Sequence, residues 1–185
     1  MEERKFEHVM VDIETMGNRP YSAIVSIGAV EFDLETGETG RDFYLNVDLN
    51  SCMNAGLKMN ADTVMWWMRQ SEEARKGITE GHRYGLGEAL NLFSRWIARG
   101  SLVWGNSARF DLGLLHDAYE TEGMVAPWDF YNERCVRTLA AFAPEIKKNH
   151  IHEGIDHNAL SDCYKQIGYC SRIWSQLKKP QGKAE

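Results

Sequence analysis

The sequence predicts an α/β fold in which helices flank a central mixed β-sheet. Residues 9–15 alternate β-branched side chains with Met10, Asp12 and Glu14, the period-two pattern typical of a strand. Residues 23–32 and 41–47 read as two further strands joined by a short turn, which indicates an antiparallel hairpin beside the first strand. Later in the chain apolar residues recur at three- and four-residue steps, as they do in amphipathic helices.

The middle of the chain predicts two helices. Asn60 or Asp62 can cap a helical run over residues 63–70, and Gly77 is expected to end the charged region that follows. Residues 87–99 carry apolar side chains on one face and should pack on the sheet.

The second half of the chain predicts further strands and helices. Residues 102–104 form a short apolar strand that leads into a helix near Asp111. Residues 128–131 are expected to be an edge strand, and residues 136–142 a short helix closed by Pro144.

A polar stretch precedes the last predicted helix. Residues 147–156 show no periodicity and predict a mobile loop, in which His150 and His152 are solvated. Residues 159–177 follow as the closing helix, with Cys163 and Cys170 in the core.

Length and composition predict a single domain over residues 1–178 and a disordered tail over residues 179–185. Apolar residues make up 43% of the chain, and no run is long enough for a membrane span or a signal peptide. We therefore expect a soluble, cytoplasmic protein with reduced thiols and no membrane partner. The formal net charge of -6 disfavours a protein that coats nucleic acid by bulk basic charge, but it does not exclude an enzyme acting on nucleic acid.

Two carboxylates end the first predicted strand. Asp12 and Glu14 are two residues apart, so their side chains project from the same face. Neighbouring carboxylates in apolar surroundings repel each other unless a cation lies between them, and Mg²⁺ prefers such hard oxygen ligands. A single Asp-x-Glu pair is more often solvated, so this interpretation depends on the rest of the chain.

Two further acids and a histidine follow in similar positions. Asp111 comes just after a predicted strand, and Asp162 lies early in the closing helix, five residues after His157. Taken singly, an Asp at a helix start is more often a cap, and a lone His is more often a surface residue. The joint pattern favours a metal site with four acids and one imidazole: Asp12, Glu14, Asp111, Asp162 and His157.

These motifs resemble those of the DEDD (DnaQ-like) 3'-5' exonucleases, in the branch whose third motif is H-x-x-x-x-D. The resemblance runs in order through residues 12–15, 106–111 and 157–162, so it covers nearly the whole chain. The strand at residues 26–30 and the helix with Trp66 and Trp67 are similar to the small exonucleases of phages and their bacterial relatives. The resemblance implies a ribonuclease H-like fold, and a place in bacterial cytoplasm or that of a phage-infected host.

The chemistry implied by the resemblance is hydrolysis of phosphodiester bonds from a 3' end, with release of nucleoside 5'-monophosphates. Asp12 would bridge two divalent ions, Mg²⁺ or Mn²⁺, and the other three acids would complete their coordination. His157 would take the proton from the attacking water, because histidine titrates near neutral pH.

Four residues in or next to the same motifs are predicted to bind substrate: Thr15, Met16, Asn106 and Phe110. Met16 or an exposed Trp could wedge against the terminal base, whereas Trp66, Trp67 and Trp104 are expected in the core. The second motif departs from the His-Asn-x-x-Phe-Asp pattern of many members, so Asn106 is expected to hydrogen-bond near the site without a catalytic role.

Two classes of function are compatible with these motifs. One is a metal-dependent 3'-5' exonuclease, and the other is a nucleic-acid-binding module that has lost activity. Because none of the five residues is missing, the enzyme is favoured. The phage-like resemblance favours single-stranded DNA, with RNA as the alternative, because the catalytic motifs serve both. The sequence is also compatible with a homodimer.

Overall fold

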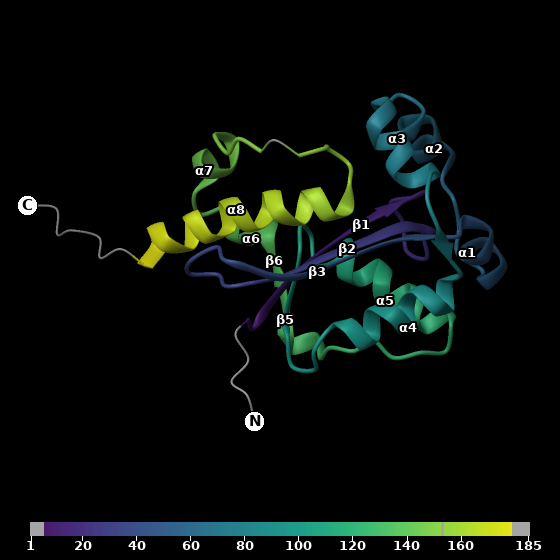
Figure 1. Cartoon of the computed structure of the whole chain (residues 1–185), viewed down its shortest axis with the longest axis horizontal. Helices are drawn as coiled ribbons and strands as arrows, with labels where there is room; N and C mark the ends of the chain where they lie inside the picture. The colour runs from purple at the N-terminus through teal and green to yellow at the C-terminus, as the bar shows by residue number, and fades with distance from the viewer. Residues whose placement is uncertain (1–5, 153, 179–185) are drawn as a thin grey trace, which may run out of the picture.

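A six-stranded sheet divides the molecule into two helical layers in the computed structural model, which describes residues 6–152 and 154–178 (Figure 1). The strand order is β4-β3-β2-β1-β5-β6. The β1–β2 and β2–β3 pairs are antiparallel and the other pairs are parallel, which confirms the predicted mixed sheet and hairpin. The strands are β1 (His8–Thr15), β2 (Ile24–Phe32), β3 (Thr39–Val47), β4 (Arg83–Tyr84), β5 (Leu102–Gly105) and β6 (Glu133–Cys135).

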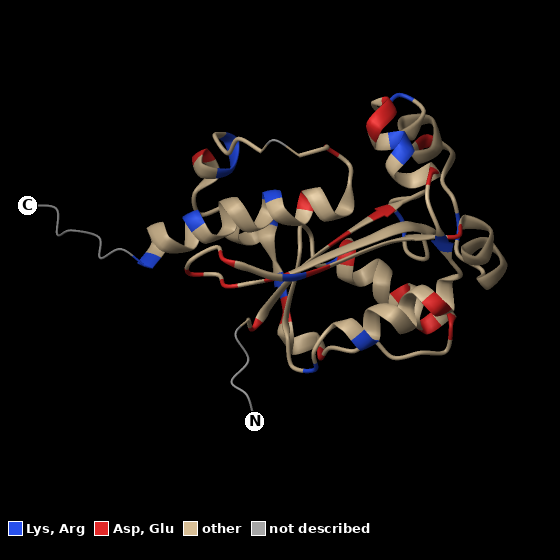
Figure 2. Cartoon of the chain, viewed as in Figure 1, with Lys and Arg blue, Asp and Glu red and all other residues tan. Residues whose placement is uncertain are grey.

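Helices cover both faces of this sheet. In Figure 1, α8 lies with α6 and α7 on one side, and α4 and α5 lie on the other. Acidic and basic residues are interspersed along the elements (Figure 2). The helices are α1 (Leu49–Ala55), α2 (Ala61–Trp67), α3 (Glu72–Thr79), α4 (Leu86–Trp96), α5 (Asp111–Thr121), α6 (Val136–Ala140), α7 (Pro144–Lys148) and α8 (Ala159–Lys178).

Alternation along β1 decides which layer each side chain meets. Val9 and Val11 belong to the core under α4 and α5, whereas Met10 belongs to the core under α8. Because successive strand residues point to opposite faces, Asp12 and Glu14 share the α8 side with Met10. The period-two pattern of β1 thus brings both carboxylates next to α8.

Gly28 allows α8 to approach the sheet at the level of Asp12. It is the β2 residue paired with Asp12. A Cβ at this position would lie 2.4 Å from the backbone carbon of Ala159, the first residue of α8. The missing side chain therefore lets the start of α8 lie against the two strands that carry and flank Asp12.

We expect Gly28→Val to lower stability by about 1–3 kcal/mol, the usual cost of overpacking. The added side chain must push the start of α8 outward, away from Asp12. Gly85→Ala is the control, because a Cβ there meets no atom within 4 Å. Thermal unfolding of both variants checks this, and an unchanged melting temperature for Gly28→Val would contradict the close packing.

The predicted boundary at Gly77 is wrong, whereas Pro144 separates two helices. Gly77 was expected to end the charged region but lies inside α3, where the Ser71 hydroxyl caps the helix by accepting from the Ala74 amide. Helix α6 ends at Ala140, before Pro144, as predicted, and Pro144 is also the first residue of α7. Proline is tolerated at that position because the first amide of a helix has no intrahelical partner.

The predicted edge strand at residues 128–131 is also wrong. Trp128 is buried, with its ring 6.1 Å from that of Phe93, and Phe130–Asn132 form a 3-10 helix. The edge strand is instead β6, the next three residues. Core packing by Trp128 therefore overrides the strand preference of this aromatic run.

The polar stretch before α8 begins in a helix and contacts α8 through its described residues. Lys147 and Lys148 belong to α7. His152 Nε2 lies 2.9 Å from Ser161 Oγ, and the His150 ring lies 5.7 Å from that of Tyr169. Both histidines, which were expected to be solvated, therefore contact α8.

None of the helices in residues 6–152 and 154–178 has the length and apolarity needed to cross a membrane. Cys163 and Cys170 are fully buried, as predicted. The predicted disordered tail, residues 179–185, lies outside the described residues, and the predicted domain boundary at residue 178 stays a prediction.

Candidate active site

A cavity of about 420 Å³ lies where β1 and β5 end. The structure brings all five predicted catalytic residues into its wall, from the end of β1, the starts of α5 and α8, and the segment before α8. They are Asp12, Glu14, Asp111, His157 and Asp162.

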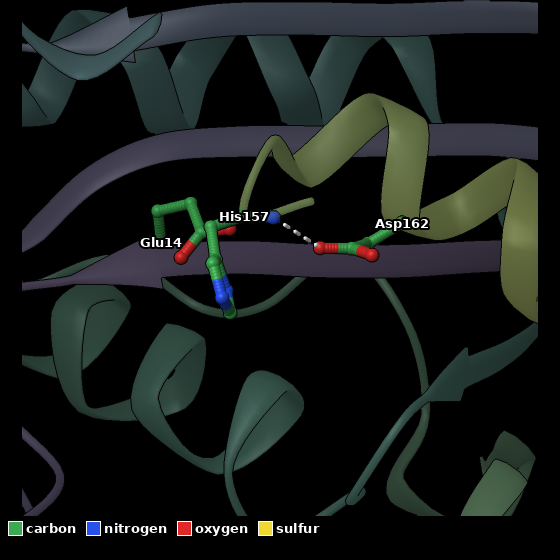
Figure 3. A group of neighbouring side chains, drawn as sticks. All are labelled: Glu14, His157 and Asp162. Atoms are coloured by element: carbon green, nitrogen blue, oxygen red, sulfur yellow. Dashed lines mark hydrogen bonds between the residues drawn. The ribbon is translucent and has the colours of Figure 1, made fainter. Parts of the chain in front are cut away.

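Glu14, His157 and Asp162 form the tightest group. One ligand atom of each lies within 4.8 Å of the others, and Figure 3 shows the three side chains around one space. The His157 amide donates to Asp162 Oδ2 at 3.1 Å. His157 has φ of 62°, a left-handed conformation that non-glycine residues seldom adopt. The Asp162 carboxylate thus helps to hold His157 in a conformation typical of functional sites.

Asp12 and Asp111 lie deeper in the cavity. Asp12 is 8% exposed and Asp111 is 2% exposed. Gln166 Nε2 donates to Asp12 Oδ1 at 2.7 Å, and the Ser107 amide donates to Asp111 Oδ2 at 3.0 Å. Each buried carboxylate therefore has one oxygen fixed by a protein donor.

The acids strongly oppose each other's ionisation. Burial, followed by the charges of Asp111, Glu14 and Asp162, raises the pKa of Asp12 well above its usual range. Burial and the charges of Asp162 and Asp111 raise the pKa of Glu14 to about 8. Burial raises the pKa of Asp111 to about 7, although the Ser107 amide partly offsets it. Four converging carboxylates with raised pKa values fit hard divalent cations, which would stabilise their ionised forms.

We expect the metal-free protein to be more stable at pH 5 than at pH 8. The folded pKa of Glu14, about 8, exceeds its ordinary value of 4.5, so the folded state retains a proton that the unfolded chain releases. The stability that this proton contributes is therefore fully present below about pH 4.5 and is lost as pH rises to about 8. Each kcal/mol shifts the melting temperature by about 2–4 °C in a domain of this size, so several degrees are expected. Thermal scans in chelator measure the trend, and Glu14→Gln should flatten it.

Divalent ions should reverse this loss at pH 8. Binding to the folded state alone adds about 2.7 kcal/mol at a hundredfold excess over Kd. Asp162→Asn should shrink the Mn²⁺-induced shift, whereas Asp129→Asn, an exposed acid outside the cavity, should not. Equal shifts in both variants would remove Asp162 from the metal site.

Several residues in the cavity wall were missed by the sequence analysis. Gln166 contacts Asp12, and Lys165 Nζ lies 4.0 Å from Asp162 Oδ1. Gln166 follows Asp162 by four residues, so helical spacing could have identified it as a neighbour. Arg137 and Tyr169 also line the cavity, but their positions depend on packing that no motif records.

Two of the four predicted substrate-binding residues line the cavity, and two do not. Asn106 and Phe110 line the cavity. Thr15 is buried and its hydroxyl donates to the Gly17 carbonyl at 2.5 Å, while Met16 is half-buried against the core. Neither Thr15 nor Met16 is part of the described cavity wall, so their contact with substrate stays a prediction.

The three tryptophans predicted in the core differ in burial. Trp67 and Trp104 are buried, as predicted, and Trp67 Nε1 donates to the Thr15 carbonyl at 2.9 Å. The prediction for Trp66 is wrong, because this residue is 39% exposed. Its ring lies 4.7 Å from that of His157 in an edge-to-face arrangement. An exposed tryptophan therefore flanks the cavity.

Comparisons with known proteins agree on the class of fold. A family model described as the 3'-5' exoribonuclease Rv2179c-like domain matches residues 7–174. The exodeoxyribonuclease of Enterobacteria phage T4 is 24% identical over 193 aligned residues, which cover 85% of each protein.

Two solved structures represent the structural likeness. The zinc-bound E. coli ExoI–ssDNA complex has a TM-score of 0.65 and 15% identity, over 93% of this chain and 41% of that one. The protein thus spans less than half the length of ExoI. The nuclease domain of 3'hExo, a DEDDh family member bound to rAMP, has a TM-score of 0.58 and 11% identity over 94% of both chains.

These matches confirm the predicted ribonuclease H-like fold and the resemblance to the His-containing branch of DEDD exonucleases. Since the family model spans nearly the whole chain, the protein belongs to the 3'-5' exoribonuclease Rv2179c-like family of 3'-5' exonucleases.

Proposed function

We propose that the protein removes nucleotides from the 3' end of single-stranded DNA and releases nucleoside 5'-monophosphates, using two divalent ions, Mg²⁺ or Mn²⁺. The observation that supports this most is the convergence of four carboxylates and one imidazole in one cavity. The raised pKa values of Asp12 and Glu14 support it further, because buried acids of this kind are typical of catalytic metal sites.

The four acids would hold the ions. Asp12, the most central of them, would contact both, and Glu14, Asp111 and Asp162 would complete the set. Two such ions, when bound, neutralise charge on the phosphoryl group and on the attacking and leaving oxygens. Gln166 holds one oxygen of Asp12 and leaves the other free for this task.

Other cavity residues would accept the proton and bind the phosphate. A ring nitrogen of His157 accepts a proton from the water that attacks the last phosphodiester. The bond from phosphorus to the 3'-oxygen of the penultimate nucleotide breaks, and the terminal nucleotide leaves as a 5'-monophosphate. Arg137 and Lys165 line the same cavity and offer positive charge to the phosphate.

RNA is the second candidate substrate. The match to a family described by exoribonuclease activity favours RNA, whereas the phage T4 relative, an exodeoxyribonuclease, favours DNA. Both polymers present the same phosphodiester to the acids, and discrimination depends on contacts to the 2'-hydroxyl.

Matched DNA and RNA oligonucleotides test the proposal. Strands of equal sequence, labelled at the 3' or the 5' end, are incubated with Mg²⁺ or Mn²⁺. We expect immediate release of labelled mononucleotide from 3'-labelled DNA, a ladder from 5'-labelled DNA, and no cutting of closed single-stranded circles. Faster loss of the RNA strand would make RNA the substrate, and binding without hydrolysis of either would indicate an inactive module.

A further inference from the structure

We propose that a second cavity, formed by Arg19 and Arg109, binds the phosphate 5' of the scissile one and so guides the strand out of the active site. This inference rests on the proposed exonuclease function. The cavity has a volume of about 390 Å³ and shares Ser107 and Phe110 with the active-site cavity, so the two lie side by side.

Both arginines are available for a ligand. They are exposed, and no hydrogen bond or ion pair joins either side chain to another residue in the part of the chain that the structure describes. The acid in the same wall, Asp117, is already engaged, because its Oδ2 accepts from the Tyr21 amide at 2.8 Å. Two arginines against one engaged carboxylate favour an anion, and guanidinium groups bind phosphate in a bidentate manner.

The loop that carries Arg19 is held by hydrogen bonds to α5 and within itself in the absence of nucleic acid. Tyr21 has φ of 60° and is attached to α5 through its amide and through its hydroxyl, which donates to Glu120 Oε2 at 3.0 Å. Ser22 Oγ accepts from the Arg19 amide at 3.1 Å and donates to the Arg19 carbonyl at 2.6 Å. A phosphate at this position therefore does not have to order the loop backbone, which lowers the entropic cost of binding.

Charge also distinguishes the cavity of Arg19 and Arg109 from another cavity that adjoins the active-site cavity. A cavity of about 340 Å³ shares Asp156 and His157 with the active-site cavity on the side of α2 and α3. Its described wall contains Glu73 and Asp156 but no Lys or Arg. Because Asp156 is already paired with Lys165 at 2.7 Å, this wall attracts a polyanionic strand less than the Arg19 and Arg109 side does, and that side is the favoured path.

Short substrates test the position of this phosphate. A dinucleotide without a terminal phosphate, dTpdT, has only the scissile phosphate, whereas pdTpdT and dTpdTpdT each have one more on the 5' side. We expect Arg19→Ala/Arg109→Ala to lower the ratio of kcat/KM for dTpdTpdT to that for dTpdT about tenfold, as for loss of charged hydrogen bonds. The same loss should appear for pdTpdT. An unchanged ratio would overturn the proposal.

A binding experiment separates this proposal from the proposed catalytic function. Anisotropy of a labelled single-stranded oligonucleotide is measured with Mg²⁺ in the His157→Asn background, over a range of salt concentrations. Each lost phosphate contact should reduce the slope of log K against log salt by about 0.7. Arg95→Ala is the control, because Arg95 is an exposed residue on α4 that lines neither cavity. If the double variant keeps the wild-type slope, or loses no more than Arg95→Ala, the proposal is wrong whether or not the protein hydrolyses DNA.

Discussion

Asp12→Asn should lower nuclease turnover at least about 10³-fold with Mg²⁺. Asp12 is the buried acid whose pKa is raised by all three other carboxylates, so it lies at the centre of the proposed metal site. Ions that stabilise the transition state contribute several kcal/mol, and each 1.4 kcal/mol corresponds to a factor of ten in rate. Steady-state hydrolysis of a 3'-labelled strand measures the loss.

The variant should fold normally, which distinguishes lost chemistry from lost structure. Asparagine has the same shape and can still accept the hydrogen bond from Gln166 Nε2, while one repelling charge disappears. We therefore expect an equal or higher melting temperature in chelator. Asp129→Asn is the matched control and should keep full turnover. Near-wild-type turnover of Asp12→Asn would overturn the two-metal proposal.

His157→Ala should lower turnover by roughly 10²- to 10⁴-fold, the usual contribution of a general base. His157→Asn is the more informative variant, because asparagine tolerates the left-handed conformation that His157 adopts, whereas alanine does not. Both variants should keep most of the Mn²⁺-induced rise in melting temperature, since all four carboxylates remain.

The rate-pH profile completes this test. Loss of the proton acceptor should change the pH dependence of kcat in both His157 variants. His82→Ala, an exposed histidine outside the cavity, is the control and should match the wild type. If His157→Asn retains both the rate and the pH profile of the wild type, His157 does not act as the base.

Regular, buried elements of the fold could be predicted from the sequence. The strand at residues 9–15 and the helix at residues 87–99 carry one clear period each, and the structure places β1 and α4 close to those ranges. Helix α1 was not predicted, although Asp48 Oδ1 caps it by accepting from the Ser51 amide and Gly56 follows it with φ of 106°. It has only two turns, so the period is too short to recognise and the caps are the main signal.

The sequence predicts which residues make up the candidate site, but not how they contact one another. Three motifs identified the acids and His157, because each lies beside a strand end or a helix start. The contacts of Gln166 with Asp12 and of Trp66 with His157 join segments far apart in the chain. Helical spacing relates Gln166 to Asp162, but long-range packing sets its contact with Asp12 and the contact of Trp66 with His157.

The contact between β1 and α8 also has a consequence for the timing of synthesis. Asp12 and Glu14 leave the ribosome well before Asp162 and the helix that carries it. A nascent chain therefore has an incomplete site while residues 159–178 are still in the exit tunnel. The four acids therefore cannot act together until α8 has been translated and has packed against β1.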